Sequence, residues 1–165
     1  MKMKKQIFYP IVLAAVAIFL GRCVQTPDYP KEPVIKFKNM TRSVLRQGTG
    51  TTDTTHVTLT FTDGDGDLGD SDSLNVFVID NRDNFLKSKF RIPFIPEEGV
   101  GNGISGEITV RVNTSCCIFP NNILPPCSSS IDFPADTLRY IIYIKDRAGH
   151  ESNRIETSDI VLLCQ

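Results

Sequence analysis

Residues 56–61 read HVTLTF, and this short stretch decides the fold class. Apolar and polar residues alternate in it, so Val57, Leu59 and Phe61 share one face of an extended chain. Other segments carry strand signals too, with Gly, Pro, Asn and Asp turn formers between them. These segments are 34–37, 74–79, 85–94, 104–112, 138–144 and 155–163. About seven short strands predict an all-β chain with an immunoglobulin-like β-sandwich, and a small β-barrel is the alternative.

The first residues predict export. Residues 1–5 carry three lysines, and residues 7–20 form an uncharged, mostly apolar run. This run is shorter than the ~20 residues that span a bilayer as a helix, so it is typical of a signal peptide. The following Leu20-Gly21-Arg22-Cys23 resembles a bacterial lipobox, in which the cysteine is acylated and becomes the new N-terminus; Arg22 departs from the usual small residue.

We therefore expect a lipoprotein signal peptide over residues 1–22 and lipidation at Cys23, which would anchor the chain to a membrane of the cell envelope, in particular the outer membrane. An uncleaved anchor and a secreted form are the alternatives. Residues 23–33 contain three prolines and predict a tether. Residues 34–165 are long enough for one domain.

Charge argues against one class of partner. The chain has 18 Lys and Arg against 19 Asp and Glu, and the signal segment holds four of the basic residues and no acid. The mature chain therefore has 14 basic and 19 acidic residues, a net charge of −5. Nucleic acids select basic surfaces, so we expect no nucleic-acid partner.

The cysteines predict disulfides. With Cys23 assigned to lipid, Cys116, Cys117, Cys127 and Cys164 remain, an even number in an exported chain. A bond between the two neighbours would close a strained ring, so one of them should pair with Cys127 and the other with Cys164. A zinc site is the alternative, but there is no C-x-x-C and both histidines are distant in sequence.

Two longer motifs carry a resemblance. The segments VTLTFTDGDGDLG at 57–69 and YIIYIKDRAGHESNRIETSDIVL at 140–162, together with the lipoprotein signal, resemble a family of uncharacterised envelope lipoproteins from Bacteroidota. The resemblance covers most of residues 34–163. It implies an envelope address and a single Ig-like domain, and it implies no particular activity.

An immunoglobulin-like topology would gather acidic loops at one pole. Residues 63–72, 97–103 and 146–153 would lie at the end where the tether enters, and the four cysteines at the other. The aspartates of the first loop would then have acidic neighbours, with two cations nearby. The acidic neighbours are Glu97, Glu98, Asp146 and Glu151, and the cations are Arg147 and His150.

The first of these loops is a candidate calcium site. Asp63, Asp65 and Asp67 have the alternate spacing of calcium loops, but the EF-hand pattern fails, because Leu68 stands where Gly is needed and Leu74 where a bidentate Glu is needed. A calcium site of another kind would use the candidate ligands Asp63, Asp65, Asp67 and Asp70. The alternative is a loop whose Asp-Gly pairs only make turns, which would stiffen the pole near the tether.

Catalysis is not expected. His150 lies close in sequence to Asp146, Glu151 and Ser152, but no nucleophile elbow accompanies them, and a hairpin turn with a left-handed Gly149 explains the segment. Tryptophan is absent and tyrosine numbers 4, so aromatic platforms for a sugar substrate are scarce. We expect a non-catalytic binding or assembly module with an unknown envelope protein or glycan partner. No cofactor is required for this role, and Ca²⁺ is the candidate ion. A structural spacer or accessory subunit and a minor hydrolase are the alternatives.

Overall fold

The computed structural model describes residues 28–50, 53–96 and 103–165. The predicted signal peptide and Cys23 lie outside these residues. Within the described part, no helix is long and apolar enough to cross a membrane.

The described chain is all-β apart from one short 3-10 turn, η1 at Pro120–Asn122. Its strands are β1 (Val34–Met40), β2 (Val44–Arg46), β3 (Thr54–Asp63), β4 (Val76–Asp80), β5 (Leu86–Phe90), β6 (Ile104–Asn113), β7 (Ala135–Leu138), β8 (Tyr140–Ile144), β9 (Ile155–Glu156) and β10 (Ile160–Leu163).

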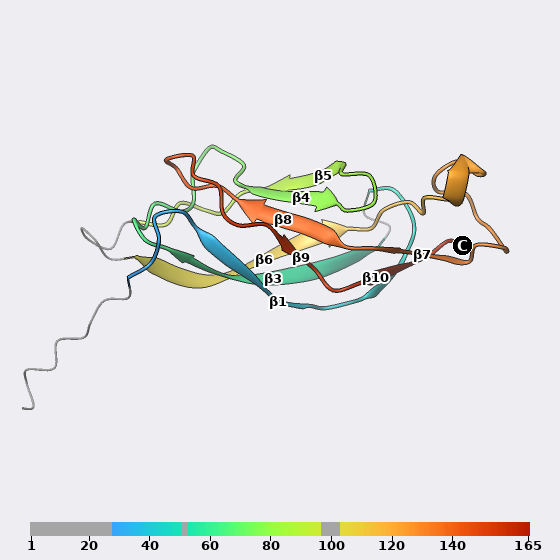
Figure 1. Ribbon diagram of the computed structural model, residues 1–165, viewed down its shortest axis with the longest axis horizontal. Coiled ribbons are helices and arrows are strands. Elements are labelled where there is room, and N and C mark those ends of the chain that lie inside the picture. The colour runs from blue at the N-terminus through green and yellow to red at the C-terminus, as the bar shows by residue number, and fades with distance from the viewer. Residues whose placement is uncertain (1–27, 51–52, 97–102) are drawn as a thin grey trace, which may run out of the picture.

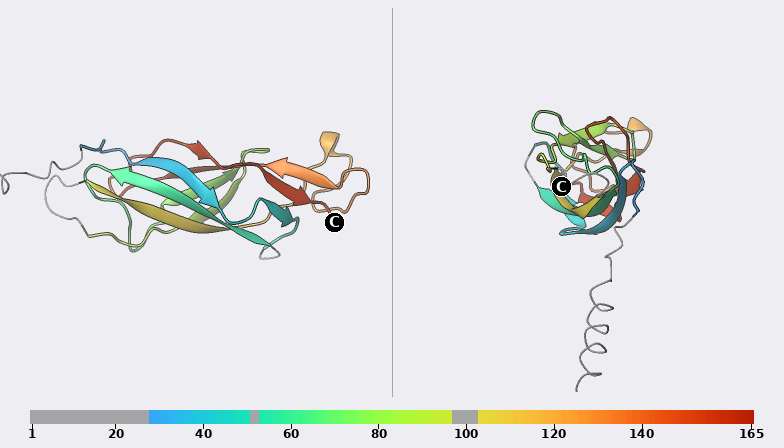
Figure 2. Two further views of the ribbon diagram at one scale, coloured as in Figure 1. Left: turned by 90° about the horizontal axis from the view of Figure 1, so that it is seen from below. Right: turned by 90° about the vertical axis from the view of Figure 1, so that its left-hand side faces the viewer.

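The strands form a β-sandwich. One sheet has the order β1-β3-β6, and it packs against a second sheet with the order β5-β4-β8-β9 (Figure 1). A third sheet, β2-β10-β7, extends the molecule at the end that carries the C-terminus, with β2 parallel to β10. The molecule is long, and the first described residues lie at the opposite end from the C-terminus, as the view from below in Figure 2 also shows.

This strand order is that of the predicted immunoglobulin-like sandwich. The first, second and fifth predicted strands form one sheet as β1, β3 and β6. The opposite sheet takes the third and fourth predicted strands as β4 and β5, together with β8 and β9, while β7 and β10 belong to the third sheet. The sheets of the described residues stay open with free edge strands, so the alternative of a small barrel is not formed. Sheet-on-sheet packing buries the face that alternation predicted: Val57 and Leu59 are fully buried and Phe61 is 7% exposed.

The strand boundaries differ from the predicted ones in ways that have local causes. The predicted strand 138–144 is divided into β7 and β8, and the predicted strand 155–163 into β9 and β10. Tyr140 and Thr157 lie next to these two breaks and bond to each other. The Tyr140 N–H donates to Thr157 Oγ1, and the Thr157 N–H donates to the Tyr140 carbonyl, each at 3.0 Å. Leu74 was predicted to start a strand, but it is 49% exposed and β4 begins at Val76.

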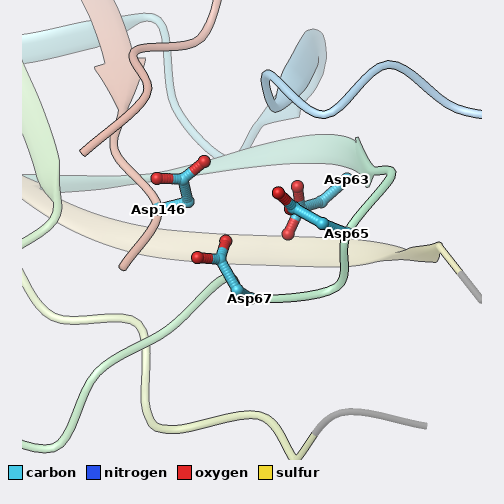
Figure 3. Close-up of side chains that lie close together, drawn as sticks. All are labelled: Asp63, Asp65, Asp67 and Asp146. Carbon is cyan, nitrogen blue, oxygen red and sulfur yellow. The ribbon is translucent and has the colours of Figure 1, made fainter. Parts of the chain in front are cut away.

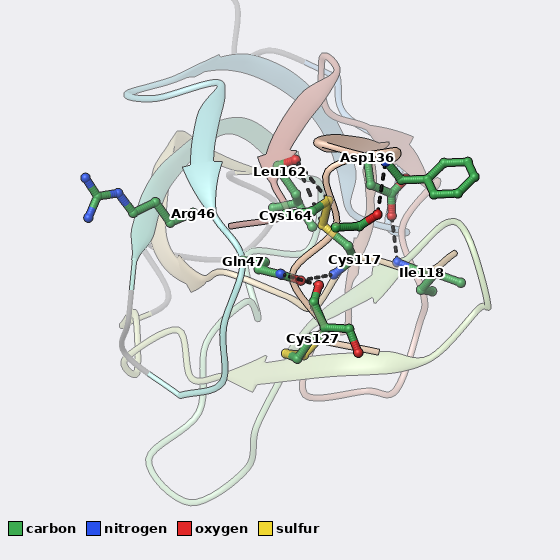
Figure 4. The surroundings of a disulfide bond; sticks show 12 residues. Arg46, Gln47, Cys117, Ile118, Cys127, Asp136, Leu162 and Cys164 are labelled. Carbon is green, nitrogen blue, oxygen red and sulfur yellow. Dashed lines mark hydrogen bonds between the residues drawn. A yellow bond between two sulfur atoms is a disulfide. The ribbon is translucent and has the colours of Figure 1, made fainter. Parts of the chain in front are cut away.

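Two disulfides cross-link the pole of the domain opposite the acidic loops. Cys116 pairs with Cys127 and Cys117 with Cys164, which is one of the two arrangements that the sequence left open. Gln47 joins the same region, because its side chain accepts from the Cys117 N–H and donates to the Ser128 carbonyl (Figure 4). Residues that are distant in sequence are therefore held together at this pole by covalent bonds.

Candidate functional site

The inward faces of two strands each end in an aspartate. In β3 every second residue is buried, and this alternation continues through Phe61 to Asp63, which is fully buried. In β8 the buried positions run through Ile142 and Ile144, and two residues further on Asp146 is 7% exposed. Because side chains of a strand alternate between its faces, both carboxylates point into the end of the core.

The loop after β3 brings a third aspartate beside them. Leu68 is fully buried, and its N–H donates to Asp63 Oδ2 at 2.9 Å. Gly66, with φ at 71°, provides the left-handed turn that brings the chain back. Leu68 therefore anchors the loop in the core, which is why Asp67 returns toward Asp63 and why the loop does not follow the EF-hand pattern.

Four carboxylates meet at this pole. Asp63, Asp65, Asp67 and Asp146 each contribute one oxygen to a group in which all these atoms lie within 4.8 Å of one another (Figure 3). We call these four residues the acidic cluster. It contains three of the four predicted calcium ligands, and Asp146 takes the place of Asp70.

The remaining acids of this pole have other roles in the described structure. Asp70 Oδ1 accepts from the Asp72 N–H at 2.8 Å, as in an Asx turn. Glu151 pairs with Lys145, with 2.9 Å between Nζ and Oε1. Glu97 and Glu98, which were expected nearby, lie outside the described residues.

The other oxygens of the cluster are fixed by neighbouring donors. Asp67 Oδ2 accepts from the Ala148 N–H at 2.9 Å. Both carboxylate oxygens of Asp146 contact His150. Oδ1 accepts from the backbone N–H of His150 at 2.8 Å, and Oδ2 lies 2.8 Å from the ring atom Nδ1. The loop of residues 63–72 and the turn of residues 146–150 are thus joined, as the predicted topology required.

Burial and mutual repulsion shift the ionisation of the cluster. Desolvation, with the added negative charges of Asp65 and Asp67, raises the pKa of Asp63 to about 7. Desolvation and the charges of Asp146 and Asp65 also raise the pKa of Asp67. The hydrogen bond to Asp146 and the attraction of its charge raise the pKa of His150.

The residues that could have suggested a catalytic triad form a turn. Gly149 has φ at 92°, the left-handed conformation predicted for it. The Ser152 hydroxyl donates to the Asn153 carbonyl at 2.8 Å and accepts from the Ile144 N–H at 3.0 Å, so it supports the end of β8. His150 contacts Asp146 and stabilises the same turn.

The segment predicted as a tether packs on this pole. The Gly64 N–H, between two residues of the acidic cluster, donates to the Pro30 carbonyl at 2.8 Å. A Cβ at Gly64 would lie 2.2 Å from the Tyr29 carbonyl oxygen, so a side chain there would displace the segment. Residues 29–30 are therefore fastened to the domain.

Sequence reasoning named Asp146 as a neighbour of the loop but not as part of the candidate calcium site. A signal for it was present: the alternation of Tyr140, Ile142 and Ile144 continues to position 146, just as the alternation in β3 continues to Asp63. A carboxylate at the inward position just beyond a strand indicates a buried acid, and two such acids at the same pole indicate a cluster.

Comparison of the chain with protein-family models, with curated proteins and with solved structures found no match. The fold and the site define a class by their own features: a disulfide-bonded, immunoglobulin-like β-sandwich with an acidic cluster at the pole where its N-terminal segment enters.

Proposed function

We propose that this chain is an exported, lipid-anchored and non-catalytic protein of the cell envelope, whose sandwich serves as a binding or assembly module beside the membrane. The signal segment and the lipobox-like Leu20–Cys23 support the address. Two disulfides in the folded domain suit an oxidising compartment outside the cytoplasm. The resemblance to Bacteroidota envelope lipoproteins points the same way.

The observation that carries the proposal is the packing of residues 29–30 on the domain. Tyr29 follows Cys23 by six residues, and a fully extended chain of that length spans at most about 20 Å. A lipid on Cys23 would therefore hold the acidic pole within that distance of the bilayer, and the disulfide pole would face away from it. This arrangement suits a module held close to the membrane rather than one on a long stalk.

One face of the sandwich is suited to a partner. On the β5-β4-β8-β9 sheet, the rings of Phe77 and Tyr143 stack with their centroids 4.7 Å apart. Lys89 and Lys145 lie over the Phe77 ring and Arg154 over the Tyr143 ring. Both rings are half-buried, and flat aromatic surface next to cations suits an acidic envelope protein or glycan.

The test uses the full chain, expressed with a C-terminal tag in a bacterium that processes lipoproteins. Intact-mass spectrometry of the membrane fraction should show acylation that starts at Cys23, and Cys23→Ala should release the protein from that fraction. Retention of Cys23→Ala in membranes, or an unmodified start elsewhere, would refute the anchor.

The same preparation tests the module. A partner captured by the wild-type protein should be lost from a Phe77→Ala and Tyr143→Ala double variant, with Phe85→Ala as the control, because Phe85 is 65% exposed and is not part of the stacked pair. If both variants capture the same components as wild type, the sheet face is not the binding surface and the spacer alternative is favoured.

A further inference from the structure

Two carboxylate oxygens of the acidic cluster are buried without a partner. Asp63 Oδ1 and Asp67 Oδ1 have no hydrogen bond to any described residue. The second oxygen of each carboxylate is held by a backbone N–H, from Leu68 and Ala148 respectively. A backbone donor therefore holds each carboxylate by one oxygen, while the other oxygen is buried with no partner among the described residues.

Such an arrangement is unfavourable unless something else compensates it. Buried polar atoms in proteins are almost always hydrogen-bonded, and buried charges are paired or coordinate metals. Asp63 is fully buried, and it belongs to the acidic cluster, in which one oxygen from each of the four carboxylates lies within 4.8 Å of the others. The unpartnered buried oxygen and the convergence of carboxylates are separate observations, and both point to a site that can bind a cation.

We propose that the acidic cluster binds a calcium ion through one oxygen each from Asp63, Asp65, Asp67 and Asp146. Oxygens bound to one Ca²⁺ at roughly 2.3–2.6 Å lie at most about 5 Å apart, and the separations within the cluster meet this limit. The ligand atoms are all carboxylate oxygens, which suit hard cations such as calcium rather than zinc or copper. Water and nearby carbonyls would complete the 6–8 ligands that calcium takes.

The surroundings of the cluster support an ion site. Asp65 is exposed, so one side of the cluster is open to solvent and an ion can enter. Asp146 is oriented by His150 on both of its oxygens, in the manner of a group that positions a metal ligand. The sequence spacing predicted Asp70 as the fourth ligand, but Asp146, from a different loop, takes that place in the cluster.

The bound ion would connect separate segments of the chain. Three ligands come from the end of β3 and the loop after it, and the fourth comes from the turn after β8. Gly64, between the first two ligands, holds the carbonyl of Pro30. Calcium would therefore fix the pole at which the N-terminal segment enters the domain. The site itself does not depend on the proposed lipid anchor.

The test uses the full chain, purified in detergent and freed of metal with EDTA. Calorimetric titration with CaCl₂ should show one ion per chain, and thermal melts should rise by several degrees in 10 mM Ca²⁺. Asp65→Asn should weaken calcium affinity at least tenfold, and because Asp65 is exposed, this variant should still fold. Asp70→Asn is the matched control from the same loop and should bind as wild type does.

The Asp63→Asn variant tests the proposed calcium site independently, through thermal stability. It removes a buried charge, so in EDTA it should melt above the wild type, whereas in calcium it should lose the stabilisation that wild type gains. Identical wild-type melts in Ca²⁺ and EDTA would overturn the proposal, as would an Asp70→Asn variant that loses as much affinity as Asp65→Asn. Stabilisation by Mg²⁺ equal to that by Ca²⁺ would overturn the assignment to calcium.

Discussion

The disulfide between Cys117 and Cys164 should contribute more to stability than the one between Cys116 and Cys127. Replacing Cys117 and Cys164 together with alanine opens a loop of 47 residues, and replacing the other pair opens a loop of 11. Cross-linking restricts the unfolded chain more when the loop is longer. The chain-entropy relation gives about 4 kcal/mol for the longer loop and about 3 kcal/mol for the shorter one.

Packing adds to this difference. Cys117 and Cys164 are both fully buried, so their replacement also leaves unfilled space in the core, whereas Cys116 and Cys127 are partly exposed. A domain of about 130 residues unfolds with an entropy of roughly 0.27 kcal/mol/K, so a loss of about 4 kcal/mol lowers Tm by roughly 15 °C.

Urea unfolding and calorimetry of the two double alanine variants measure directly how much each disulfide contributes to stability. Each double variant removes both partners, so no unpaired thiol is left to exchange. A fall in Tm of less than about 3 °C in the Cys117 and Cys164 variant would refute the reasoning, since chain entropy alone requires several times more. A larger loss in the Cys116 and Cys127 variant would also refute it.

Two further predictions concern buried polar groups of the sandwich. Tyr140 is fully buried and its hydroxyl donates to the Asn113 carbonyl at 3.1 Å, so Tyr140→Phe should lose about 1 kcal/mol in urea unfolding, and an unchanged midpoint would show that this bond contributes nothing. Burial opposes the ionisation of Asp80, but hydrogen bonds from Arg82 outweigh burial and lower its pKa, so Asp80→Asn should cost about 2 kcal/mol at neutral pH. Because the folded-state pKa is lowered, this advantage of the wild type is present above about pH 4 and is lost as pH falls through the lowered pKa. Melts of both proteins from about pH 7 to pH 2 should therefore converge at the acid end, and a gap that stays constant would contradict the assignment.

Much of the fold could be predicted from local patterns. The alternation in HVTLTF predicted β3 and the buried face of Val57 and Leu59, since a residue's side of a strand depends only on its place in the alternation. The strand β2 was missed because it has only three residues, and only the middle one is buried. Its place is determined by parallel pairing with β10, which is far away in sequence.

The sequence by itself determined the all-β class, the even set of cysteines and the position of the acidic loop. Tertiary structure decided which cysteines pair, and it decided that Asp146 rather than Asp70 joins Asp63, Asp65 and Asp67. Spacing along one loop cannot make that choice. A cluster forms where side chains from separate strands reach the same end of the core, and that depends on how the two sheets pack.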